Sequence, residues 1–202
     1  MLDVYEKLIQ EILVKGHGSV DAWLDEKTTN ILRKQLIQHY KNDHLHLAGI
    51  GKMEELHLED SIRKDQIYWL NKTTDCPAEQ CFFRAMNGFI QHLNMTCFAG
   101  IRSAEFHYAL YEKGAYYKKH IDQFRNDKSR QFSVVFYLNE NWIPENGGEL
   151  ILYLKDEKKE ITPNFGKLVC FRSDIPHEVK TSQTQRMSLT GWLKNSSEID
   201  LF

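Results

Sequence analysis

The sequence predicts an α+β protein in which a jelly roll of about eight short strands is supported by helices on one sheet. Two observations predict this fold. Apolar residues recur at helical spacing through much of the first hundred residues, whereas from about residue 102 they alternate with polar residues. Turn signals rich in glycine and asparagine separate the alternating segments. At 202 residues, with no linker or repeat, we expect one domain over 1–202, with helical support in roughly 1–100 and a jelly-roll core in roughly 101–195.

Three amphipathic helices are expected before the jelly roll. Apolar residues of the first segment follow a helical stripe until Gly16 and Gly18 stop the run. Asp25 or Thr28 would cap a second helix, whose apolar stripe continues to residue 40. Pro77 fits the first turn of a third helix, because a missing N–H is harmless there. We expect these stripes to form core rather than a binding surface.

The strands are expected where β-favouring residues cluster or where polar and apolar residues alternate. The candidate segments are 62–70, 104–111, 116–122, 131–138, 149–154, 167–171, 177–179 and 186–193. The charge run at 155–160 is interpreted as a solvated hairpin tip. Many short strands after a helical half indicate two packed sheets with helices on one of them.

A possible metal site lies in the second strand of the jelly roll. Alternate side chains of a strand share a face, so His120 and Asp122 are expected to point the same way. Such a pair is a weak signal alone, since most are merely solvated. A second histidine, His177, follows an apolar strand. Two histidines and one carboxylate, with open positions on the metal, are typical of non-heme Fe(II) oxygenases.

The last strand predicts an anion near the same site. Arg186, Ser188, Thr190 and Trp192 share its polar face. Arg186 cannot lose its charge, and a buried unpaired charge would be costly, so it needs an anionic partner. One hypothesis is an internal carboxylate such as Asp174 or Glu178. The other is a carboxylate-bearing ligand, with Tyr137 as a further donor on the inward face of its strand.

Composition excludes several classes of function. The net charge is −2 with acids and bases interspersed, which gives no electrostatic footprint for nucleic acid or for a membrane. No apolar run approaches the ~20 residues of a membrane helix, and the first residues lack a signal-peptide pattern. We therefore expect a cytoplasmic protein. The four cysteines form no CxxC pair and are expected to be reduced and mostly buried.

Several motifs of this sequence resemble one enzyme family. They include His120-Ile121-Asp122, His177 with Arg186 nine residues later, Gly147-Gly148-Glu149-Leu150 and Arg186-Met187-Ser188-Leu189-Thr190-Gly191-Trp192. Over roughly 45–194 the chain resembles the 2-oxoglutarate- and Fe(II)-dependent dioxygenases. It is most similar to the prolyl hydroxylases that modify hypoxia-inducible factor in animals, and especially to their bacterial relatives. The resemblance implies a double-stranded β-helix and an enzyme that uses Fe(II), 2-oxoglutarate and O2, with ascorbate in support.

The resemblance also implies residue roles. The implied Fe(II) ligands are His120, Asp122 and His177. The residues implied to hold 2-oxoglutarate are Arg186, Tyr137, Tyr111 and Thr190, with the first two on its distal carboxylate. The residues implied to contact the substrate are Tyr117, Trp192, Asp65 and Arg130. The family pairs the acid matching Asp65 with the arginine matching Arg130, which orders a loop over the substrate. The segment from Tyr111 to His120 is one residue shorter than in the animal enzymes.

The leading hypothesis is hydroxylation of a proline in a protein substrate, coupled to oxygen supply, with elongation factor Tu as a candidate substrate by the resemblance to bacterial relatives. One alternative is a hydroxylase of a free amino acid or another small molecule. Another is a non-catalytic jelly-roll binding module, which would bind metal without turning over 2-oxoglutarate. The full set of metal-binding and anion-binding residues argues against the binding module.

Overall fold

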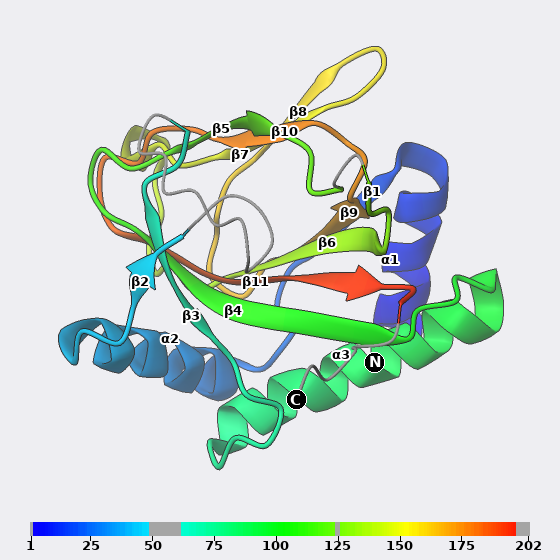
Figure 1. The fold of residues 1–202 in the computed structure, drawn as a ribbon, viewed down its shortest axis with the longest axis horizontal. Helices are drawn as coiled ribbons and strands as arrows, with labels where there is room; N and C mark the ends of the chain where they lie inside the picture. Colours follow the sequence, from blue (N-terminus) through cyan, green and yellow to red (C-terminus); the bar gives the residue numbers. More distant parts are fainter. Residues whose placement is uncertain (1, 49–61, 124–125, 197–202) are drawn as a thin grey trace.

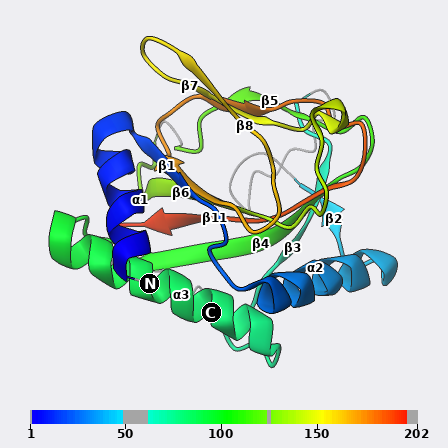
Figure 2. The same cartoon turned by 180° about the vertical axis from the view of Figure 1, so that it is seen from behind.

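The computed structural model describes residues 2–48, 62–123 and 126–196. Within these ranges the chain forms two antiparallel sheets, of seven and four strands, and three α-helices. The sheets face each other, and the helices cover the outer face of the larger sheet (Figure 1). The same layers are seen from behind in Figure 2. The predicted jelly roll with helices on one sheet is confirmed.

The elements are as follows. The helices are α1 (Leu2–Lys15), α2 (Glu26–Lys41) and α3 (Pro77–Cys97), with a short 3-10 turn η1 (Pro144–Asn146). The larger sheet has the order β1 (His17–Val20), β9 (Leu168–Arg172), β6 (Arg130–Tyr137), β11 (Arg186–Lys194), β4 (Ser103–Tyr111), β3 (Asp65–Trp69) and β2 (His46–Leu47). The smaller sheet has the order β5 (Tyr117–His120), β10 (His177–Val179), β7 (Leu150–Tyr153) and β8 (Lys158–Ile161).

The helices begin where the sequence predicts. The Asp25 side chain accepts a hydrogen bond from the backbone N–H of Thr28 at 2.9 Å, so Asp25 caps α2. Pro77 occupies the first turn of α3. The buried stripes of the three helices pack on one face of the larger sheet, where they meet apolar residues of β4, β6, β9 and β11. This core supports the outer face of the larger sheet, so the inner face of that sheet is left for the site.

Side chains alternate between the two faces of the strands that line the interior. In β4 the even-numbered residues Ala104, Phe106, Tyr108 and Leu110 pack toward the helices. Ala109 and Tyr111 instead join a second buried cluster between the two sheets. Tyr137 belongs to that second cluster as well, while Phe136 packs against the helices, as the parity of the strand predicts. The inner faces of the two sheets therefore enclose the predicted site.

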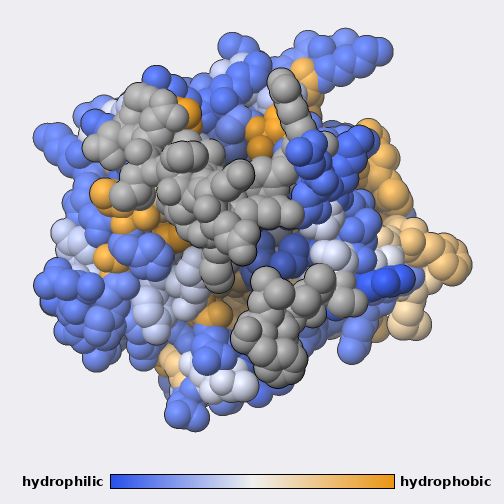
Figure 3. All heavy atoms as spheres, in the orientation of Figure 1, coloured by the Kyte–Doolittle hydropathy of each residue, from blue (hydrophilic) through white to orange (hydrophobic). Residues whose placement is uncertain are grey.

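Four strands differ from expectation. β1 was not expected; Gly18 allows it to pass α1, because a Cβ there would lie 2.8 Å from the Leu8 carbonyl oxygen. The two-residue strand β2, which pairs with β3, was not expected either. β5 ends at His120, so the strand expected over 116–122 is too long. The expected hairpin tip at 155–160 is partly wrong, because 158–161 forms β8 and pairs with β7. Three of the four residues of β8 are exposed and charged, so the sequence shows no alternation that would indicate a strand. The projecting hairpin is largely hydrophilic in Figure 3.

The four cysteines form no disulfide, and only Cys170 is fully buried. No helix of the described residues is long and apolar enough to cross a bilayer.

Candidate active site

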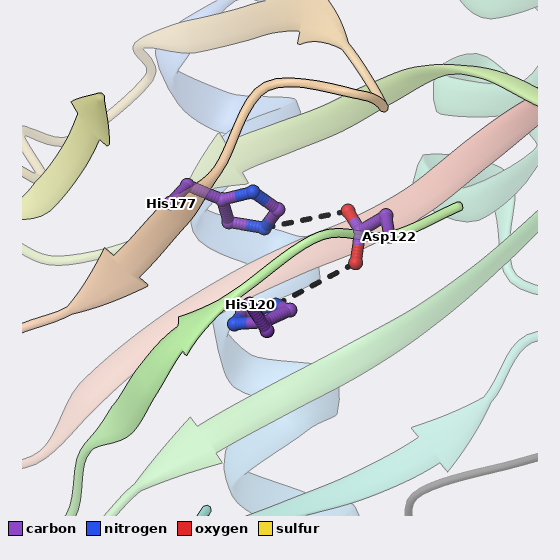
Figure 4. A group of neighbouring side chains, drawn as sticks. All are labelled: His120, Asp122 and His177. Atoms are coloured by element: carbon purple, nitrogen blue, oxygen red, sulfur yellow. Dashed lines mark ion pairs between the residues drawn. The ribbon is translucent and has the colours of Figure 1, made fainter. Parts of the chain in front are cut away.

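Two histidines and one aspartate converge between the sheets. His120 ends β5 and His177 begins β10, and the two residues are paired across these neighbouring strands. Asp122 lies between them, with its Oδ1 3.6 Å from His120 Nε2 and its Oδ2 3.4 Å from His177 Nε2 (Figure 4). One ligand atom from each residue lies within 4.8 Å of the others. The structure therefore brings together the three predicted metal ligands.

Hydrogen bonds fix the orientation of both imidazoles. His120 Nδ1 lies 2.7 Å from the Lys118 carbonyl oxygen, and His177 Nδ1 lies 2.9 Å from that of Ile175. Because a carbonyl oxygen can only accept, each Nδ1 carries the proton and each Nε2 presents a lone pair toward Asp122. Such outer hydrogen bonds are typical of histidines that bind metal ions. This nitrogen and oxygen donor set fits Fe(II) with open positions left for other ligands.

Asp122 is held in place from the larger sheet. Asp122 lies beyond the end of β5. The backbone N–H of the next residue, Gln123, donates to the Ser173 carbonyl oxygen at 3.3 Å and so ties this segment to the larger sheet. Ser133 Oγ donates to Asp122 Oδ2 at 2.6 Å. The hydroxyls of Ser133 and Ser173 lie 2.9 Å apart, and since Ser133 gives its hydrogen to the carboxylate, Ser173 is the donor between them. Both serines are buried, so this chain of hydroxyls is shielded from water.

The carboxyl of Asp122 is ionised despite its burial. Burial alone would raise its pKa, but the neighbouring side chains of His177 and His120 and the hydrogen bond from Ser133 outweigh that effect and hold the pKa well below its usual range. Burial lowers the pKa of His177, which favours the neutral imidazole. An anionic carboxylate beside a neutral imidazole is the protonation state that a divalent cation requires.

Arg186 lines the same pocket and is the candidate anion-binding residue. It is 2% exposed, and its Nε donates to the Gly148 carbonyl oxygen at 2.8 Å. Gly148 has φ +67°, and a Cβ there would lie 3.0 Å from Arg186 Cδ, so glycine lets the backbone approach. The guanidinium lies 4.8 Å from the Tyr111 ring and 5.1 Å from the Tyr137 ring. The Tyr137 hydroxyl is buried and has no hydrogen-bond partner among the described residues.

The internal partners considered for Arg186 are wrong. Asp174 pairs with Arg172, and Glu178 accepts a hydrogen bond from Tyr153. Within the described ranges no carboxylate pairs with the Arg186 guanidinium. A buried cation and a buried phenol hydroxyl thus lie side by side without an anion, which is the arrangement expected of a carboxylate-binding site. Burial raises the pKa of Tyr137, so its hydroxyl remains a donor at neutral pH.

The expected pair between Asp65 and Arg130 is absent. Arg63 instead donates to both carboxylate oxygens of Asp65, at 2.7 and 2.6 Å. Arg130 donates to Glu105 at 3.0 Å and lies over the Trp192 ring at 3.5 Å. The sheet order explains the difference, because β4 and β11 separate β3 from β6, a span of about 14 Å at the usual strand spacing.

Arg63 also supports one of the histidines. Its guanidinium lies 4.2 Å from the centroid of the Tyr117 ring. Tyr117 in turn stacks on His120, with ring centroids 3.5 Å apart and planes 13° apart. Burial raises the pKa of Tyr117 to about 12, so the ring is a neutral phenol. The pair formed by Asp65 and Arg63 is therefore connected to the metal-binding end through a continuous stack.

The comparisons with known proteins agree with this geometry. A family model, the 2OG-Fe(II) oxygenase superfamily, matches residues 106–194. The crystal structure of a Pseudomonas putida prolyl-4-hydroxylase is 31% identical, with a TM-score of 0.87 over 96% of this chain and 100% of that chain. The chain belongs to the prolyl hydroxylase family of 2-oxoglutarate- and Fe(II)-dependent dioxygenases.

Other family members show how far the similarity extends. A Trichoplax adhaerens prolyl hydroxylase in complex with a hypoxia-inducible factor peptide shares the fold, with a TM-score of 0.85 at 23% identity over 96% of this chain and 90% of that chain. Human Egl nine homolog 1 is 27% identical over 158 residues, which is 68% of this chain and 34% of that protein. The matched region thus spans about a third of the length of that relative.

The pocket contains most of the residues that the family resemblance implied. Those that line it are Asp65, Tyr111, Tyr117, His120, Asp122, His177, Arg186, Thr190 and Trp192. Tyr137 and Arg130 adjoin it through their contacts with Arg186 and Trp192. Sequence reasoning missed Arg63, His107 and Ser133, which line it as well. Parity could have found all three, because each lies two or four residues from a predicted site residue of the same extended segment.

Proposed function

We propose that this protein is a prolyl hydroxylase that binds Fe(II) and 2-oxoglutarate in the pocket between its sheets and acts on a protein substrate. His120, Asp122 and His177 would bind the metal, and Arg186 with Tyr137 would bind the distal carboxylate of 2-oxoglutarate. Tyr111 and Thr190 would line the cosubstrate pocket. The observation that carries the proposal is a buried guanidinium, with no carboxylate partner among the described residues, in the same pocket as the three candidate metal ligands. Residues 1–202 would act as one domain.

When bound, Fe(II) supplies the redox chemistry that couples O2 to the decarboxylation of 2-oxoglutarate, with succinate, CO2 and a hydroxylated substrate as products. The chain's own residues orient the metal and the cosubstrate and shield them from water. The Nδ1 hydrogen bonds of His120 and His177 keep both Nε2 lone pairs on the metal position. By holding the distal carboxylate, Arg186 and Tyr137 would set the position and direction of the cosubstrate. Ascorbate would support the enzyme by keeping its iron reduced.

The substrate end would be formed by Tyr117, Trp192, Asp65 and Arg130. Arg130 covers the Trp192 ring, and the pair of Asp65 and Arg63 is buried beside Tyr117. These planar groups can pack on a proline ring and its flanking backbone. The peptide complex of the Trichoplax adhaerens relative supports a peptidyl substrate. Elongation factor Tu is our candidate, on the resemblance to the bacterial branch; it would place the enzyme in the cytoplasm and tie hydroxylation to oxygen supply.

The test is incubation of the purified protein with Fe(II), 2-oxoglutarate, ascorbate, O2 and elongation factor Tu from the same source. Tryptic peptides are followed by mass spectrometry. A single added oxygen on one proline is expected, and it should be absent without 2-oxoglutarate and in His177→Ala. Succinate without modification of that factor would move the search to other proteins or to small molecules. Metal binding without succinate would support a non-catalytic binding module.

A further inference from the structure

Buried polar atoms without partners gather at this pocket. Among the described residues such atoms include the Tyr137 hydroxyl, His107 Nδ1 and Trp192 Nε1. His107 and Trp192 line the pocket, and Tyr137 adjoins it beside Arg186. A buried polar group without a partner costs about 1–3 kcal/mol, so a cluster of them indicates that a ligand supplies the missing partners. The proposed cosubstrate accounts for Tyr137 but leaves the other two unexplained.

His107 lies away from Arg186 and Tyr137, the residues proposed to bind the distal carboxylate of the cosubstrate. In β4 it pairs with Thr190 of β11, whereas Tyr111 pairs with Arg186. The offset of four positions between His107 and Tyr111 corresponds to about 13 Å along a strand. This distance separates His107 from Arg186, and Trp69 of β3 is its other cross-strand neighbour.

Three aromatic rings form a wall around that position. The His107 ring centroid lies 4.8 Å from that of Trp69 and 5.4 Å from that of Trp192. His107 is 3% exposed, but Trp69 is 43% exposed. The wall therefore runs from the protein surface into the pocket. Indole rings pack well on a saturated ring such as that of proline, and the polar edges of His107 and Trp192 remain for hydrogen bonds.

The imidazole of His107 is uncharged at neutral pH. Burial, together with the Arg63 cation, lowers its pKa to about 4. A neutral imidazole offers one donor and one acceptor, and an indole N–H is a donor only. This combination matches the N–H and C=O groups of a peptide backbone. Neither side chain carries a charge that could pair with the ammonium or the carboxylate of a free amino acid.

We infer that His107 binds the peptide backbone beside the target proline, by a hydrogen bond to the amide group that follows it. Trp192 Nε1 donates to a neighbouring carbonyl oxygen of the same peptide. The inference rests on the proposed function and deepens it, because it makes the substrate a peptide rather than free proline. Free proline has a carboxylate where the peptide has this amide.

The test compares two small probes. One is the capped tripeptide acetyl-alanyl-prolyl-alanine amide, and the other is its analogue with an ester in place of the amide after proline. Dissociation constants are measured by NMR relaxation on protein loaded with Mn(II) and 2-oxoglutarate without O2. The wild-type protein should bind the amide about 2- to 12-fold more tightly than the ester, as expected for one neutral hydrogen bond.

His107→Phe should reduce this amide-to-ester ratio to about one, and His107→Asn should restore part of it. The dissociation constant for 2-oxoglutarate should not change in either variant. His17→Phe is the control, because His17 is also a buried histidine but lies on β1, outside the pocket. An equal ratio in wild type and His107→Phe, or no preference in wild type, would overturn the inference. Succinate formation by the wild type without any peptide tests the proposed enzyme class separately.

Discussion

Replacing Arg186 with methionine removes a buried cation but keeps most of the volume of its side chain. Without ligand, two effects oppose each other. The variant no longer buries an unpaired charge, but it leaves the Gly148 carbonyl oxygen without the hydrogen bond that Arg186 now donates. The free energy of unfolding of the ligand-free protein should therefore change little. With 2-oxoglutarate bound, Arg186→Met should be less stable than the wild type, because the ligand's carboxylate loses its charged partner.

The magnitude follows from the burial of the site. Removing one partner of a buried charge pair costs about 2–5 kcal/mol, which raises the dissociation constant for 2-oxoglutarate about 30-fold or more. In the wild type, ligand at 100 times its dissociation constant adds about 2.7 kcal/mol of stability. For a chain of 202 residues this raises Tm by about 5–10 °C. In Arg186→Met the same concentration should give at most about 1–3 °C.

Thermal unfolding of Mn(II)-loaded protein, with and without 2-oxoglutarate and in the absence of O2, measures both effects. Arg172→Met is the matched control, because Arg172 is exposed, pairs with Asp174 and lies outside the pocket. It should keep the full ligand-dependent increase in Tm. If 2-oxoglutarate stabilised Arg186→Met as strongly as the wild type, Arg186 would not be the cosubstrate anchor.

Three further predictions concern the neighbours of the site. Ser133→Ala should weaken Mn(II) binding about 10-fold, and Ser133→Thr should restore it, as measured by electron paramagnetic resonance. Unchanged affinity in Ser133→Ala would exclude a role of Ser133 in positioning Asp122. Asp65→Ala removes the buried carboxylate that accepts two hydrogen bonds from Arg63, so urea unfolding should show a loss of about 1–3 kcal/mol, part of it recovered in the double variant with Arg63→Met; no recovery would contradict the pairing. His107 has a pKa of about 4 when folded and about 6.5 when unfolded, so the unfolded state binds its proton first as the pH falls. The wild type should therefore lose up to about 3 kcal/mol more stability than His107→Phe between pH 7 and pH 4, and parallel stability curves would refute the shift.

The cluster of candidate metal ligands could be predicted because residue type and spacing are local signals. His120 and Asp122 are close in sequence, and His177 follows a strand that alternation locates. The reason given for Asp122 was incomplete, however. β5 ends at His120, so strand parity does not place Asp122; Ser133 of β6, which hydrogen-bonds to it, and Ser173, just after β9, hold it. Such contacts between different strands leave no periodic pattern in the sequence.

The charged residues show the same limit. The need of Arg186 for an anion follows from its charge, and the structure shows it buried with no carboxylate partner among the described residues. The choice among internal partners could not be made, because it depends on where Asp174 and Glu178 point. The expected pair of Asp65 and Arg130 failed since Arg63, two residues away on the same segment, reaches Asp65 with a bidentate geometry.

The most direct test of the account follows the oxygen atoms. The protein is incubated with Fe(II), 2-oxoglutarate and oxygen gas enriched in the heavy isotope, and the succinate formed is analysed by mass spectrometry. We predict succinate that carries a single heavy oxygen atom, formed by the wild type and by Arg172→Met, and lost in His177→Ala and Arg186→Met. Absence of succinate from the metal-loaded wild type, or succinate without the heavy atom, would contradict a 2-oxoglutarate-dependent dioxygenase site in this pocket.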